Sequence, residues 1–250
     1  MFVDFLAFQE ATLLMAAVLI GYVGVLAAFA MRRNDAAGLR SALRGAAVPI
    51  GGLGAIATSL AIWAEMAWPL PGAYNILFTD IYLLFGVTLL VLAVSFASYS
   101  KLQYAGLFAL VSGGLAIAYG WSGYQLGMTK DPFETFLLYG AFGLAGILSF
   151  PASVAVDHYL SHPESTVFAA PLAIAHRRPS LAGATRAVQP VVPGGASAVP
   201  EAPNATPRIF RVPLYINAAF VVFLVAVALA AVAALFYLDS TLPAHLAHPP

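Results

Sequence analysis

One short stretch of this chain, between two long apolar runs, concentrates the side chains that could bind a ligand. It contains Glu65, Trp68, Tyr74 and Asn75, and Asp80 follows it closely. An acid near membrane depth is costly and usually faces a partner, a water-filled cavity or an ion path. One interpretation is therefore that these five side chains form an outward-facing, oxygen-rich pocket for a small cation or polar solute.

The same stretch also has a purely structural interpretation. Trp68 precedes Pro69, and Pro71 precedes Gly72, so an α-helix that reaches this stretch must end near Trp68. Tryptophan and tyrosine side chains are common at the level of the lipid headgroups. Asp80 would then serve as the N-cap or first-turn acid of the next helix. An interfacial helix-turn-helix is thus the alternative to a pocket.

A second set of candidate ligands lies about eighty residues further along. His158 and His162 are four residues apart and would share one face of a helix that continues past Asp157. Imidazole and carboxylate groups are common metal ligands, so a metal site is an alternative here. Pro163 and the proline-rich sequence after it argue against such a helix. The candidate metal ligands are Asp157, His158, His162 and His176.

Several kinds of chemistry are excluded by residue type. The chain has no cysteine, which excludes disulfides, iron-sulfur clusters and a cysteine nucleophile. All five histidines lie outside the apolar runs, so haem held between helices is not expected. Lys101 and Lys130 both lie at loops, which argues against a retinal Schiff base. No catalytic residue, no cofactor other than the alternative metal and no nucleic-acid partner is predicted.

The composition is that of an integral membrane protein. Hydrophobic residues make up 61% of the chain and charged residues 9%, whereas about a quarter of the residues of a soluble domain are charged. A membrane-spanning helix needs about 20 apolar residues. We predict an all-α bundle with six spans, at about residues 8–31, 45–67, 80–99, 102–124, 133–156 and 213–238.

Basic residues predict the orientation of these spans. The loop from Arg32 to Arg44 is short and strongly basic, which places it in the cytoplasm by the positive-inside rule. Threading the spans alternately then leaves ten of the eleven lysines and arginines inside, with Lys130 outside. We predict a multi-pass protein of a prokaryotic cell (plasma or inner) membrane, with both termini outside and the Glu65–Asp80 stretch on the outer face.

Glycine spacing predicts how the helices pack. Gly106, Gly113, Gly120 and Gly127 recur every seven residues in and after the fourth span, and Gly140, Gly143 and Gly146 do something similar in the fifth. Such stripes let helix backbones approach closely in membranes. We expect them to be packing surfaces and not the lining of a pore.

The composition changes abruptly after the fifth span. Residues 158–212 are rich in proline, alanine, serine and glycine and lack an apolar period, which is typical of an extended linker. We therefore predict a five-helix core over residues 1–157, a cytoplasmic linker over 158–212, and a membrane anchor with a short outer tail over 213–250.

The core resembles a known family. The runs Trp68–Phe78 and Tyr82–Gly86, with the opening Met1–Asp4, are similar to a domain-of-unknown-function family of small polytopic membrane proteins from archaea and bacteria. Its motif reads Trp-Pro-Leu-Pro-Gly-x-Tyr-Asn, and the similarity covers about residues 1–157. The resemblance supports the five-helix core and implies no activity. The linker and the sixth span depart from the family pattern.

Three functions are compatible with these features. The first is a non-catalytic accessory subunit of a larger membrane complex, energy-converting or oxidative, with other membrane subunits and the bilayer as partners. It rests on the absence of redox ligands, the glycine stripes, the featureless last span and the linker. The second is a small transporter or channel that uses Glu65 and Asp80. The third is a subunit of a metal-dependent membrane oxidoreductase.

Overall fold

A computed structural model describes residues 5–98, 101–161 and 214–247, and in the last of these ranges it describes the side chains of residues 218 and 220–236. The secondary structure of this part of the chain is entirely α-helical. The all-α class is thereby confirmed. The helices are α1 (Phe5–Arg32), α2 (Ala36–Ala67), α3 (Ala73–Ser98), α4 (Leu102–Gln125), α5 (Pro132–Ser161) and α6 (Leu214–Ala247).

Most of these helices have the dimensions of membrane spans. Within the described residues, α1 to α5 are each long and apolar enough to cross a bilayer. The described apolar part of α6, Phe220–Phe236, is shorter. This chain is therefore a multi-pass membrane protein, and its sixth span and its orientation stay predictions.

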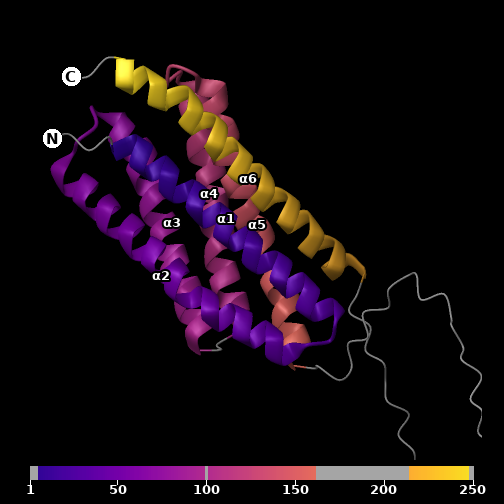
Figure 1. The fold of residues 1–250 in the computed structure, drawn as a ribbon. Coiled ribbons are helices and arrows are strands. Elements are labelled where there is room, and N and C mark those ends of the chain that lie inside the picture. The colour runs from indigo at the N-terminus through magenta and orange to yellow at the C-terminus, as the bar shows by residue number, and fades with distance from the viewer. Residues whose placement is uncertain (1–4, 99–100, 162–213, 248–250) are drawn as a thin grey trace, which may run out of the picture.

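The six helices form a closed ring in chain order. Each helix packs against the next along the chain, and α6 closes the ring by packing against both α5 and α1. Figure 1 shows α1 and α6 side by side across the front of the bundle, with α2 and α3 to one side. The pair α4 and α5 has the most extensive interface. A ring of this kind leaves a space along its axis that side chains from all helices must line.

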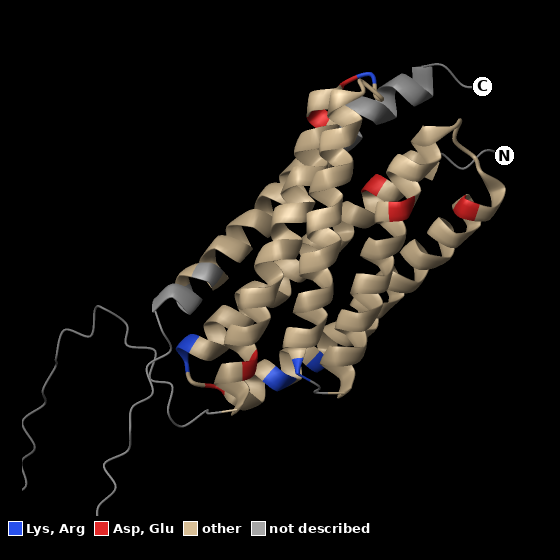
Figure 2. Ribbon diagram, turned by 180° about the vertical axis from the view of Figure 1, so that it is seen from behind, with Lys and Arg blue, Asp and Glu red and all other residues tan. Residues whose placement is uncertain are grey.

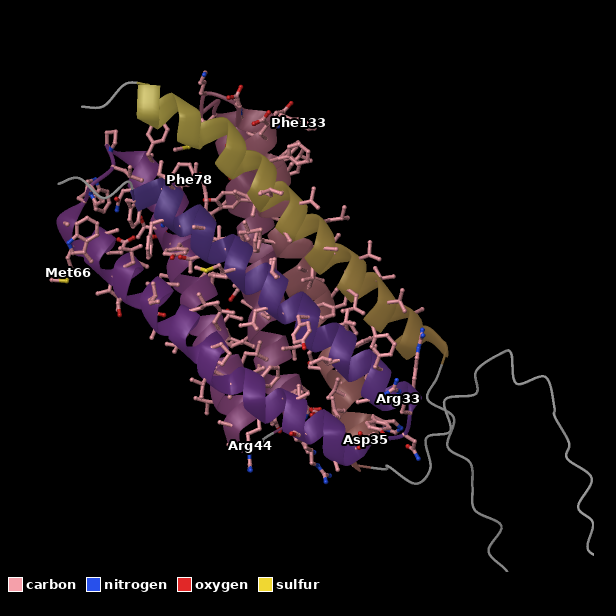
Figure 3. All side chains as sticks on the ribbon, viewed as in Figure 1. Arg33, Asp35, Arg44, Met66, Phe78 and Phe133 are labelled. Atoms are coloured by element: carbon pink, nitrogen blue, oxygen red, sulfur yellow. The ribbon has the colours of Figure 1, made fainter. Side chains whose placement is uncertain are left out.

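The two ends of the ring differ in charge. Figure 2 shows lysine and arginine gathered at one end of the bundle, and Figure 3 places Arg33 and Arg44 there and Met66 and Phe133 at the other. We call the first the basic end; it carries Arg32, Arg33, Arg40, Arg44 and Lys101. The opposite, acidic end holds the α2–α3 and α4–α5 turns and carries Glu65, Asp80, Asp131 and Glu134 beside Lys130.

Hydrogen bonds at the helix ends explain why the helices extend beyond the predicted spans. Asp35 is the N-cap of α2, and its side chain accepts a hydrogen bond from the Gly38 amide at 2.7 Å. That cap starts α2 at Ala36, well before the predicted residue 45. An apolar window detects only the part of a helix that is suited to lipid, whereas a cap acts on the backbone wherever it occurs. The polar first turns of α2 were therefore missed.

The predicted glycine stripe holds the α4–α5 pair together. A Cβ atom at Gly113 would meet the Gly143 carbonyl oxygen, and one at Gly146 would lie 2.7 Å from the Ala109 carbonyl oxygen. The backbones of the two helices thus touch where only glycine allows it. Gly127 is an exception, because it lies in the turn after α4 with a φ of 59° and has open space around it. Gly140 also has nothing within 4 Å.

Candidate functional site

The α2–α3 turn is a sharp reversal at the acidic end. Trp68 ends α2 in the left-handed conformation (φ 48°), and its amide donates a hydrogen bond to the Ala64 carbonyl at 2.9 Å. Pro69 and Pro71 follow, and Gly72 supplies a second positive φ of 56° before α3 begins at Ala73. The predicted end of the helix near Trp68 is confirmed.

Asn75 closes this turn from the inside. Its side chain is fully buried and donates from Nδ2 to the Ala64 carbonyl at 3.3 Å, while its Oδ1 accepts from the Leu70 amide at 3.4 Å. Trp68 and Tyr74 are both substantially exposed on the described surface. These three residues therefore fit the structural interpretation, with Asn75 fixing the turn and the two aromatic side chains at its surface.

Asp80 does not lie at the start of α3, where the structural interpretation of this stretch placed it. Helix α3 begins at Ala73, seven residues earlier than expected, because the turn and the bonds of Asn75 start it there. The interpretation of Asp80 as an N-cap or first-turn acid was wrong. Instead, Asp80 lies two turns inside α3, and its Oδ2 accepts a hydrogen bond from the Tyr119 hydroxyl of α4 at 2.9 Å.

Glu65 is the second acid of this site and lies beside Asp80. It lies in the last turn of α2, and its carboxyl group interacts with that of Asp80 as a side-chain pair. Its Oε1 is a buried atom without a hydrogen-bond partner in the described part of the chain. Of the five predicted pocket residues, the structure thus brings together Glu65 and Asp80, and it adds Tyr119.

The electrostatics of the carboxyl pair limit what it can hold. Two ionised carboxylates in contact repel each other, so a proton or a cation between them stabilises the pair. Of the basic residues in the described helices and turns, Lys130 is the one at this end of the bundle, and it lies in the α4–α5 turn. The described residues contain no group of three or more acids or histidines arranged to hold a metal ion. The described residues therefore offer two carboxyl groups and a phenol, which can share a proton or contribute oxygen ligands to a cation.

One residue of the second candidate site, Asp157, has a structural role. Asp157 caps α4 from the neighbouring helix: its two carboxylate oxygens accept hydrogen bonds from the amides of Leu102 at 2.9 Å and Gln103 at 2.8 Å. His158 is in the last turn of α5, while His162 and His176 lie outside the described residues. The metal hypothesis for these residues stays a prediction.

Sequence reasoning missed several polar residues near the acidic end. Gln9 and Glu10 of α1 are buried, and Gln9 donates from Nε2 to the Phe78 carbonyl at 3.5 Å. The buried Tyr139 of α5 donates from its hydroxyl to the Leu77 carbonyl at 2.7 Å. Gln9 and Glu10 could have been identified from the sequence, because they are two adjacent polar residues at the start of an apolar run. No local sequence feature marks Tyr119 or Tyr139 as partners of α3.

Residues 1–176 match the family described as protein of unknown function (DUF981). The chain belongs to the DUF981 family. The match spans α1 to α5, so the carboxyl pair and the α2–α3 turn belong to the DUF981 part of the chain and α6 lies outside it. Searches of the curated proteins and of the solved structures found no match.

Proposed function

We propose that this DUF981 protein binds a small monovalent cation at the Glu65–Asp80–Tyr119 site, in competition with a proton, and that it works as a small membrane transporter or channel. The observation that carries the proposal is the contact between two carboxyl groups from adjacent spans. Without a cation the pair holds one proton. Binding of a cation releases that proton, so charge and protons balance.

The surroundings of the pair support cation binding. The Tyr119 hydroxyl donates to Asp80 and so holds that carboxyl group in place beside Glu65. The free Oε1 of Glu65 supplies an acceptor without a competing donor in the described residues. Acidic groups inside spans usually face a partner or an ion path, and here each acid has the other as its neighbour.

The location of the site is part of the proposal. Placing the basic end in the cytoplasm by the positive-inside rule puts the carboxyl pair near the outer face of a prokaryotic cell membrane. A cation would then reach the site from outside the cell.

Liposome flux tests the proposal. The purified protein is reconstituted, and the entry of Na⁺ or K⁺ down a gradient is followed together with the pH inside the vesicles. We expect flux by the wild type, and its loss in Glu65→Gln and in Asp80→Asn. Glu134→Gln is the matched control, because Glu134 is an exposed acid at the same end, outside the pair. Flux that is unchanged by the two pair substitutions would refute the assignment of the site.

The accessory-subunit and oxidoreductase hypotheses stay predictions. Blue-native electrophoresis of gently solubilised native membranes tests the first, and migration only as a free monomer would contradict it. Metal analysis of the purified protein tests the second, which fails if no stoichiometric metal is present.

A further inference from the structure

The ring of helices surrounds a partly open cavity that the proposed function does not use. Its volume is about 250 Å³, and all six helices contribute to its walls. It extends from Gln9 and Glu10 near the acidic end to Leu102 and Val156 near the basic end. The volume corresponds to roughly eight water-sized groups, which is small for a bulky solute and suits a segment of a hydrocarbon chain.

The walls of this cavity are mostly apolar, although Gln9, Glu10 and Tyr82 also line it. Most of the lining side chains are aliphatic or aromatic. The hydroxyls of Thr88, Ser149 and Ser153 donate to carbonyls of their own helices, at 2.7, 2.6 and 2.8 Å. They are therefore already satisfied and do not need a polar ligand. An empty apolar cavity destabilises a protein in proportion to its volume, so a chain that fills it stabilises the fold.

A second hollow lies at the basic end, and its lining includes polar and charged side chains. Its volume is about 470 Å³, and Arg40 and Lys101 line it together with Ser95, Asp157 and Ser161. Asp157 accepts hydrogen bonds from the first two amides of α4, so its negative charge is directed at that helix terminus. The two exposed cationic side chains then dominate the charge of the hollow.

The two spaces adjoin. Leu43, Phe96 and Leu102 line both of them, one residue from each of α2, α3 and α4. The Arg40 guanidinium donates to the Leu160 carbonyl of α5 at 3.3 Å, which holds this cation at the rim between α2 and α5. A cationic mouth thus leads into an apolar channel within one bundle.

We infer that this composite site binds an anionic phospholipid of the bilayer, with its headgroup between Arg40 and Lys101 and one acyl chain inside the ring. Basic pockets between membrane helices are suited to anionic headgroups. The charge of the mouth selects an anionic over a zwitterionic headgroup, and the adjoining cavity selects a lipid over a free anion. The cationic mouth lies at the opposite end from the carboxyl pair, and lipid binding there does not depend on cation binding.

Lipid binding to the purified, delipidated full chain tests this inference. Native mass spectrometry and thermal unfolding are measured with long-chain phosphatidylglycerol, long-chain phosphatidylcholine, dihexanoyl phosphatidylglycerol and inorganic phosphate. We expect long-chain phosphatidylglycerol to bind at least tenfold more tightly than the other three and to raise the unfolding temperature. Each rim charge contributes about fivefold in affinity, so Arg40→Gln with Lys101→Gln should weaken its binding by roughly 25-fold.

Arg33→Gln is the matched control, since Arg33 is an exposed arginine at the same end that lines neither space. It should leave binding within about twofold of the wild type. Equal binding of the two long-chain lipids would overturn the role of the rim charges. Equal effects of phosphate, or of the short-chain lipid, would overturn the placement of an acyl chain inside the ring. Loss of binding in Arg33→Gln equal to that in the double variant would reduce the effect to general surface charge and also refute the site.

Discussion

Substituting Gly113 by alanine should separate the α4–α5 pair and lower the stability of the whole bundle. A Cβ atom there would meet the Gly143 carbonyl oxygen and would lie 3.0 Å from the Ile147 amide nitrogen and 3.1 Å from the Gly146 Cα. All three neighbours are backbone atoms, so none can rotate away. The helices must therefore move apart along their most extensive interface.

A neighbouring glycine, Gly114, provides the control that isolates the free-energy cost of this clash. Gly114 is also inside α4, but a Cβ added there has nothing within 4 Å. Both substitutions gain the same intrinsic helix propensity, about 1 kcal/mol, which cancels when the variants are compared. What remains is the overpacking cost of about 1–3 kcal/mol. We expect Gly113→Ala to be less stable than Gly114→Ala by that amount.

Unfolding in mixed detergent micelles, titrated with sodium dodecyl sulfate and followed by circular dichroism, measures the difference. Gly114→Ala should be as stable as the wild type or more so. Equal free energies of unfolding for the two variants would refute the close approach of α4 and α5 at Gly113.

Three further predictions concern hydrogen bonds between elements. Asp157→Ala removes the cap of α4 and should lower the free energy of unfolding by about 1–2 kcal/mol, measured in the same titration; wild-type stability would contradict the capping role. Asn75→Ala removes the two bonds that close the α2–α3 turn and should cost about 1–2 kcal/mol and speed proteolysis at residues 68–72, whereas an unchanged cleavage rate would argue against it. Tyr119→Phe removes the hydrogen bond to the Asp80 carboxyl group, worth about 1.5 kcal/mol, and should weaken cation binding roughly tenfold in a binding titration; unchanged affinity would remove Tyr119 from the site.

Local sequence signals predicted the features that depend on local chemistry. The proline pair after Trp68 ended α2 where expected, since proline acts on its own backbone and on the residue before it. The seven-residue glycine spacing identified the packed face of α4, because that spacing keeps residues on one side of a helix. Gly127 broke the pattern only because α4 had already ended at Gln125.

Features that depend on distant partners were not predictable in the same way. The start of α3 depends on Asn75 reaching back to Ala64 of α2, so an apolar window placed it too late. Tyr119 is 39 residues from Asp80 in sequence, and an aromatic residue near a span end is normally read as an interfacial side chain. Helix α6 closes the ring by packing against α1, although the two helices lie near opposite ends of the sequence. No local sequence period predicts this contact.

Proton release on addition of a cation tests the central claim most directly. The purified protein is held in lightly buffered detergent solution with a pH indicator, and Na⁺ or K⁺ is added as the chloride salt, with a bulky organic cation as the ionic-strength control. If the Glu65–Asp80 pair exchanges one proton for one cation, the wild type and Glu134→Gln should release up to about one proton per chain, and Glu65→Gln and Asp80→Asn should release none. No release from the wild type at any pH between about 5 and 9, or equal release from the Glu65→Gln variant, would contradict the account.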